Sequence, residues 1–136
     1  MFTNTRVLKR IGGHWLDWPT LNAHAIDGDK FVCMDNLIEG KPCLIYSFGI
    51  ANDWTFEDFM DFRGCEIHAH DPTVDDPPKR GNNINFRKVG LGVAKDTLEN
   101  VYMKNDQDTT EIEMDTLENV LKRNGHSTTE IEILKV

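Results

Sequence analysis

Residues 43–58 read Cys-Leu-Ile-Tyr-Ser-Phe-Gly-Ile-Ala-Asn-Asp-Trp-Thr-Phe-Glu-Asp. The run Cys43–Phe48 is short and apolar, with β-branched and aromatic side chains, and this is typical of a parallel strand that is buried on both faces. Gly49 ends the run, and a helical pattern begins shortly after it. The order strand, glycine turn and helix N-terminus is the geometry that receives nucleotide-like ligands in doubly wound folds.

The segment after the glycine turn has the apolar spacing of a helix. The residues that share its apolar face are Phe56, Phe59 and Met60. This spacing predicts a helix over Thr55–Arg63. Thr55 and Asp58 fit a capping box at its start, and Gly64 fits its end.

The composition indicates one domain and excludes several classes of partner. The chain has 136 residues, 39% of them hydrophobic, and a net charge of −8 with no basic run. This charge argues against nucleic acid or an acidic membrane surface as the main partner. No apolar stretch approaches the roughly 20 residues that span a bilayer. No signal peptide is visible at the N-terminus, which favours the cytoplasm, with a secretory lumen left open for a longer form.

The chain has three cysteines, Cys33, Cys43 and Cys65. Each lies in or beside an apolar run, so buried thiols are the first interpretation. One disulfide among them is the alternative if the chain visits an oxidising compartment.

The remaining pattern predicts a mostly parallel α/β fold. Besides residues 43–48, the predicted strands are 30–34, 65–70, 84–89 and 131–136. Residues 30–34 are expected to pair with a short N-terminal segment. The stretch 71–83 is too rich in Pro, Asp and Gly for a crossover helix. The strands after Gly49 should run outward from strand 43–48, and the last strand should return beside it. This places the switch point of the sheet at Gly49.

The C-terminal part contains two copies of a 19-residue repeat, 96–114 and 115–133. Both copies begin with Asp-Thr-Leu-Glu-Asn-Val and contain Thr-Thr-Glu-Ile-Glu. The second copy predicts a helix with a capping-box pattern at Asp115 and Glu118 and a stop at Gly125, followed by the last strand. The first copy has a weaker apolar face, and we expect a helix or an irregular insertion there.

Asp71 ends the second long strand, beside the predicted glycine turn. A carboxylate in that place is positioned to accept hydrogen bonds from ribose hydroxyls. The alternative is that Asp71-Pro72 only starts a turn.

A set of motifs in order along the chain resembles the methyltransferase-like domain family related to FkbM-type methyltransferases. The motifs are residues 10–13, 27–33, 46–50, 54–57, 64–73, 86–92, 114–117, 125–126 and 131–136. The resemblance implies a Rossmann-like, class I methyltransferase fold and S-adenosylmethionine as the cofactor. The residues expected to bind the cofactor are Ser47, Phe48, Gly49, Ile50, Asp53, Asp71 and Leu91. On this analogy Gly49 and its neighbours line the methionine part, Asp71 holds the ribose, and Leu91 lies near the adenine.

The chain also departs from the family pattern. The turn keeps a single glycine, Asp53 stands where relatives often have another, and His70 replaces an expected apolar aromatic residue. The family continues beyond Val136 with further strands and the candidate catalytic acids. We therefore expect one incomplete domain over 1–136, with an N-terminal segment 1–40 and a core 41–136, and we assign no catalytic residue.

Three functions remain open from the sequence. The first is a methyltransferase whose acceptor is a small molecule, a glycan or a protein. The second is a non-catalytic remnant that binds a ligand or a partner. The third is a metal-dependent hydrolase that uses His68 and His70, which point to one face of a strand, with Asp71 nearby. A Cys65–His68 nucleophile pair is disfavoured because the two residues lie on opposite faces.

An apolar last strand at the sheet edge also predicts self-association.

Overall fold

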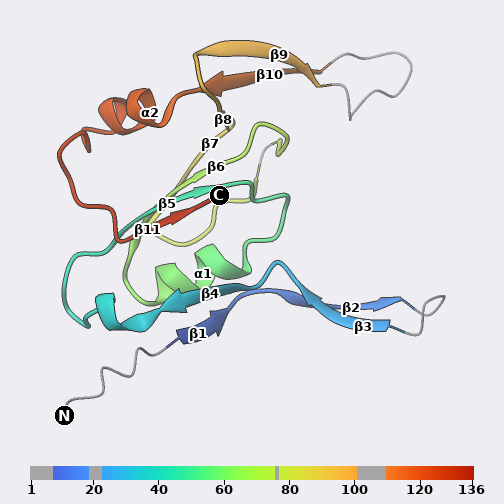
Figure 1. Ribbon diagram of the computed structural model, residues 1–136, viewed down its shortest axis with the longest axis vertical. Coiled ribbons are helices and arrows are strands. Elements are labelled where there is room, and N and C mark those ends of the chain that lie inside the picture. Colours follow the sequence, from blue (N-terminus) through green and yellow to red (C-terminus); the bar gives the residue numbers. More distant parts are fainter. Residues whose placement is uncertain (1–7, 19–22, 76, 101–109) are drawn as a thin grey trace.

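The computed structural model describes residues 8–18, 23–75, 77–100 and 110–136. Its centre is a four-stranded parallel sheet with the order β11-β5-β6-β7 (Figure 1). The strands are β5 (Leu44–Phe48), β6 (Glu66–His70), β7 (Ile84–Arg87) and β11 (Ile133–Lys135). This order confirms the predicted topology, in which two strands follow β5 outward and the last one returns beside it.

The two α-helices of the described residues cover opposite faces of this sheet (Figure 1). Helix α1 (Thr55–Phe62) packs Phe56 and Met60 into the cluster that contains Ile45. Helix α2 (Leu117–Arg123) packs Val120 into the cluster that contains Tyr46. Every residue of β5 is therefore buried, as the apolar run predicted for a strand covered on both sides.

The connection from β6 to β7 contains no helix among its described residues, as predicted from its composition. Arg80 fastens this loop to α1 through an ion pair with Asp58 and lies over the ring of Trp54.

The start of α1 differs from the predicted capping box. Its N-cap residue is Trp54, whose side chain makes no capping hydrogen bond. The carboxylate of Asp53 instead accepts hydrogen bonds from the backbone N–H and the hydroxyl of Thr55. The predicted end is confirmed, because Gly64 follows the helix with φ 85°.

The N-terminal strands form two antiparallel pairs. Strand β1 (Leu8–Ile11) pairs with β4 (Lys30–Cys33), and β2 (His14–Trp18) pairs with β3 (Ala23–Asp27). The β1–β4 pair confirms the expected partner of residues 30–34. It adds Ile11 and Val32 to the core on the α1 side of the sheet, and a short 3-10 helix, η1 (Met34–Asn36), leads away from β4.

The two copies of the repeat fold differently. In the first copy β9 (Asp96–Asn100) pairs with β10 (Thr110–Asp115), and β10 also pairs with β8 (Gly90–Leu91). The expectation of a helix or an irregular insertion was therefore wrong for the described part of this copy, and residues 101–109 lie outside the described residues. In the second copy the same first six residue types lead into α2. In the second copy Val120 and Leu121 pack with the cluster that contains Tyr46 of β5, and this packing stabilises the helix.

Thr116, not Asp115, caps α2. The Thr116 hydroxyl accepts a hydrogen bond from the backbone N–H of Asn119. Asp115 is fully buried and binds the side chains of Asn119 and Arg123. The hydrogen bond from the side chain of Asn119 lowers the pKa of Asp115 below its usual value more than burial raises it, and Arg123 adds to the effect. Gly125 ends the helix with φ 75°, as predicted.

Cys43 and Cys65 form a disulfide, so buried thiols were the wrong interpretation for these two residues. The parallel pairing of β5 with β6 brings the two strand starts together, with 4.6 Å between the two Cα atoms. Cys33 is a free thiol.

Within the described part of the chain β11 pairs with β5 alone, and Leu134 and Val136 are exposed. This agrees with the predicted edge strand, and self-association stays a prediction. Neither described helix has both the length and the apolar character needed to cross a bilayer.

Candidate functional site

The turn after β5 has an unusual backbone. Gly49, Ala51 and Asn52 have φ values of 76°, 48° and 65°. Left-handed conformations are costly for the two residues that have a Cβ atom, and such strain gathers at functional sites. The Gly49 N–H donates to the carbonyl of His70 at 2.9 Å, which ties the turn to the end of β6. A Cβ atom at Gly49 would meet no atom within 4 Å, so the turn faces open space.

Asp71 holds this turn from the neighbouring strand. Its Oδ2 accepts hydrogen bonds from the backbone N–H groups of Ile50 and Ala51, at 2.8 and 2.9 Å. Its Oδ1 accepts from the backbone N–H and the hydroxyl of Thr73, at 2.8 and 2.6 Å. Asp71 therefore has two structural roles. It starts the turn at Pro72, and it connects the loop after β5 to the end of β6.

The environment of Asp71 favours its ionised form. Burial raises the pKa of the carboxyl group, but hydrogen bonds from Thr73, Ala51 and Ile50 outweigh burial and hold the pKa below its usual value. A carboxylate offers about four lone-pair positions, and these four donors use them. A ribose hydroxyl would have to replace one of the Thr73 donors in order to bind here.

A buried polar chain lies beneath the turn. The Ser47 hydroxyl donates to Oε1 of Glu57 at 2.6 Å, and the Lys135 ammonium group donates to the same oxygen at 2.8 Å. Lys135 Nζ is also 3.5 Å from the carbonyl oxygen of Gly49. Sequence reasoning included Ser47 but missed Glu57 and Lys135. The one available signal was the register of the last strand, because Lys135 pairs directly with Ser47.

The other predicted residues of the turn are buried. Phe48 stacks on His70 with 4.8 Å between ring centroids, and Ile50 belongs to the core cluster on the α1 side. Burial lowers the pKa of His70 to about 4, so its imidazole is neutral at neutral pH. Its Nδ1 lies 3.1 Å from the carbonyl oxygen of His68.

The proposed hydrolase ligands do not come together. Among the described residues, the group close enough to hold a metal ion is Glu66, His68 and His126. It contains neither His70 nor Asp71, which instead hold the loop and the strand end described above.

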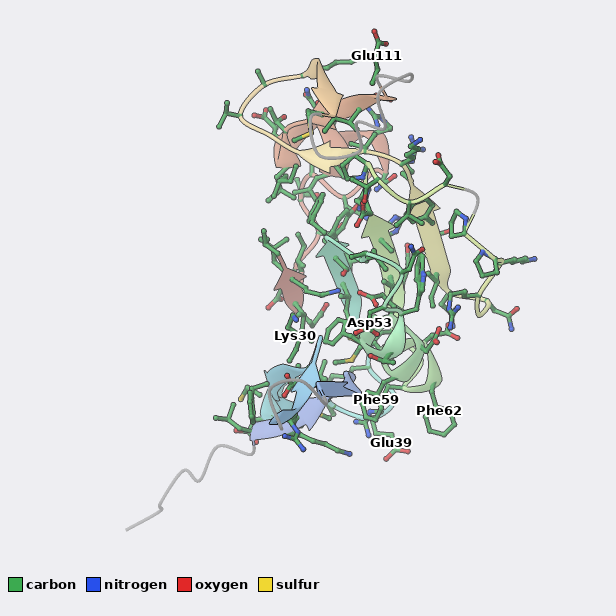
Figure 2. The ribbon with its side chains drawn as sticks, turned by 90° about the vertical axis from the view of Figure 1, so that its right-hand side faces the viewer. Lys30, Glu39, Asp53, Phe59, Phe62 and Glu111 are labelled. Atoms are coloured by element: carbon green, nitrogen blue, oxygen red, sulfur yellow. A yellow bond between two sulfur atoms is a disulfide. The ribbon has the colours of Figure 1, made fainter. Side chains whose placement is uncertain are left out.

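Asp53 and Leu91 lie on the two sides of the site. The Asp53 side chain lies at the start of α1 (Figure 2), and a Cβ atom at Gly28 would collide with its carboxylate. Leu91 packs with the cluster on the α2 side of the sheet. A cavity of about 320 Å³ beside the turn is lined by Ala51, Asn52, Asp53, Trp54, Thr55 and Arg80, and thus includes Asp53 but neither Asp71 nor Leu91.

The structure thus brings Asp71 into direct contact with Ile50, the residue after Gly49, and Ser47 binds Glu57 within β5's buried surroundings. The Asp53 N–H donates to the carbonyl of Ile50 at 2.9 Å, and Leu91 packs with the cluster on the α2 side, which contains Phe48.

Comparisons with known proteins identify a family. A family model described as a methyltransferase domain matches residues 19–136. Neither the curated proteins nor the solved structures yield a match.

Proposed function

Because the chain belongs to the methyltransferase domain family, we propose that it binds S-adenosylmethionine at the carboxyl end of β5 and serves methyl transfer to an acceptor. We further infer that the chain adopts a Rossmann-like methyltransferase fold. One observation carries the site: the carboxylate of Asp71 holds the backbone of Ile50 and Ala51 at the switch point of a parallel sheet. Ligands of doubly wound folds bind at that point.

The residues at the turn fit such a ligand. Gly49 leaves open space where a side chain would otherwise stand, so the backbone is approachable. The Glu57 Oε2 atom is buried without a hydrogen-bond partner among the described residues. It lies in the polar chain beneath Gly49, and an unpaired buried carboxylate oxygen is suited to an ammonium donor. We assign Gly49, with Ser47 and Glu57 below it, to the methionine end of the cofactor.

The other predicted residues are assigned to the ribose, to the adenine and to the support of the turn. Asp71 shapes the loop after β5 and offers Oδ1 to a ribose hydroxyl in exchange for Thr73. Leu91 provides an apolar surface for the adenine, and Phe48, Ile50 and Asp53 hold the turn in place.

The chemistry is simple in outline. When bound, the cofactor supplies an electrophilic methyl group on a sulfonium ion. The residues of this chain hold the cofactor and exclude water from it, and proximity and orientation of the acceptor supply most of the rate. An acceptor that carries a proton passes it to a base.

Calorimetric titration of the folded chain with S-adenosylmethionine tests the proposal. Loss of a hydrogen bond to a charged group costs about 1–3 kcal/mol, so the Asp71→Ala variant should bind about 5- to 150-fold more weakly. The matched control is Asp75→Ala, because Asp75 is exposed and lies outside the site. Absence of binding by the folded wild-type chain would contradict the proposal. Equal affinity of wild type and Asp71→Ala would contradict the placement of the cofactor.

A further inference from the structure

A second cluster of polar groups lies at the opposite end of the parallel sheet. Glu66, His68 and His126 each place one ligand atom within 4.8 Å of the others. Glu66 and His68 are alternate residues of β6 and therefore share a face, and His126 follows α2. Glu66 pairs with Leu44 at the start of β5, whereas the Gly49 turn follows its end. Four residues of strand, about 13 Å, separate Glu66 from the end of β6, so this cluster is distinct from the site at Asp71.

The distances within the cluster are close to those of a metal centre. Oε1 of Glu66 is 2.7 Å from Nε2 of His68 and 3.9 Å from Nε2 of His126. Bonds of about 2.0–2.2 Å in a tetrahedral zinc site put neighbouring ligand atoms about 3.4 Å apart. The two distances from the carboxylate are therefore within about 1 Å of those in a coordination sphere. All three ligand atoms lie within 4.8 Å of one another, so binding an ion requires a small adjustment of the side chains.

The burial of the three side chains suits this adjustment. The side chains of His68 and His126 are 12% and 17% exposed, and that of Glu66 is 52% exposed. The imidazoles are thus held largely by their surroundings, and the carboxylate is the ligand with the most freedom to move.

Tyr46 orients both imidazoles. Its ring stacks on His68 with 5.0 Å between centroids, and its hydroxyl oxygen lies 2.7 Å from Nδ1 of His126. Asn124 donates a hydrogen bond to the same oxygen at 3.0 Å. When Nδ1 of His126 carries the proton, it donates a hydrogen bond to the hydroxyl oxygen of Tyr46. The lone pair on Nε2 of His126 then faces Glu66. Metal-binding histidines usually have such a partner on the other ring nitrogen.

The surroundings attract cations and leave room for a further ligand. An open pocket of about 460 Å³ adjoins the cluster. Its described lining contains Glu66, His126, Glu130 and Glu132 and no Lys or Arg. Negative charge in a concave site raises the local concentration of cations.

We propose that Glu66, His68 and His126 bind one Zn²⁺ ion through Glu66 Oε1 and the Nε2 atoms of the two histidines. Two imidazoles and one carboxylate form a donor set that zinc uses in sites with an open fourth position. That position faces the acidic pocket and takes water or another small ligand. The ion joins β6 to the segment after α2 and so fastens the C-terminal part of the chain to the sheet.

The test is titration of the untagged, metal-free chain with Zn²⁺ in a calorimeter, with the absorption spectrum of the Co²⁺-loaded chain as a second readout. We expect one ion per chain and the intense visible bands of four-coordinate Co²⁺. Loss of an outer hydrogen-bond partner costs about 10- to 100-fold in metal affinity, and Tyr46→Phe should fall in that range. His68→Gln, His126→Gln and Glu66→Gln remove ligands and should each cost more than about 100-fold.

Glu118→Gln is the matched control, because Glu118 is exposed on α2 and belongs neither to the cluster nor to the lining of the pocket, and the zinc affinity of this variant should equal that of wild type. Glu66 is half exposed, so Glu66→Gln keeps the fold and the test stays decisive even if a histidine variant unfolds. No stoichiometric binding by the folded wild type, or equal affinity of wild type and Glu66→Gln, would overturn the assignment. S-Adenosylmethionine affinity should not change in Glu66→Gln, so this proposal and the proposed function fail independently.

Discussion

Lys135 Nζ lies 2.8 Å from Oε1 of Glu57, and both side chains are largely buried. Glu57 is fully buried, and the Lys135 side chain is 9% exposed. The pair joins the last strand of the sheet to the first helix, directly beneath the Gly49 turn. A buried ion pair stabilises a fold less than its distance suggests, but loss of one partner leaves an uncompensated charge.

We predict that Glu57→Gln lowers the free energy of unfolding by about 3–5 kcal/mol, because the Lys135 ammonium group stays buried without its counter-charge. Urea unfolding followed by circular dichroism measures this change. The neighbouring Asp58→Asn variant is the control, since Asp58 pairs with Arg80 at the surface, and it should cost less than about 1 kcal/mol. The double variant Glu57→Gln/Lys135→Met should recover part of the loss. Strictly additive effects of the two substitutions would show that the pair does not couple.

The hydrogen bonds that Asp71 accepts should make the stability of the fold depend on pH. The pKa of Asp71 is below its usual value in the folded chain. The ionised carboxylate therefore contributes stability that is complete above the unfolded pKa of about 3.9 and is lost as the pH falls through the folded pKa.

We predict that wild type is more stable than Asp71→Asn at pH 7 and that this difference shrinks as the pH falls below about 4. Urea unfolding at several pH values measures the difference. The exposed Asp75→Asn variant should show a much smaller change. A difference between wild type and Asp71→Asn that stays constant with pH would argue that Asp71 acts through shape alone.

The repeat offers a prediction with an internal control. The Thr116 hydroxyl accepts the Asn119 N–H at 3.1 Å, so Thr116→Ala should destabilise the fold by about 1 kcal/mol. Amide hydrogen exchange of Asn119 should become faster in this variant. Thr97 occupies the same place in the first copy but lies in β9. Thr97→Ala should leave the exchange of Asn119 unchanged, and an equal effect of both variants would contradict the capping role.

The disulfide should be visible in a thiol titration. The unreduced, denatured chain should have one reactive thiol, Cys33, and the reduced chain three. The bond closes a loop between residues 22 positions apart, and such a cross-link stabilises a fold by about 3 kcal/mol. Cys43→Ala/Cys65→Ala should therefore unfold at lower urea concentration than wild type, and Cys33→Ala should not. Three reactive thiols before reduction would contradict the bond.

Much of the fold and part of the candidate site follow from local pattern. The strand 44–48, its glycine turn and α1 were predictable because burial on both faces selects continuous apolar residues and a left-handed turn selects glycine. The position of Asp71 beside that turn was predictable because neighbouring parallel strands end at the same edge of a sheet. The disulfide could only be left open, since cysteine spacing does not reveal which strand starts lie together.

The sequence by itself determined the order of the four parallel strands and of α1 and α2, the switch point at Gly49 and the likeness to methyltransferase domains. Only the tertiary structure decided which secondary structure each copy of the repeated sequence adopts. Asp-Thr-Leu-Glu-Asn forms a strand at 96–100, yet at 115–119 it spans the end of β10, a cap and the start of α2. The helix of the second copy packs against β5. Tertiary packing also joined Glu57 to Lys135 and His126 to His68. Local propensities are weak and contacts between distant residues leave no periodic signal, so packing decides both.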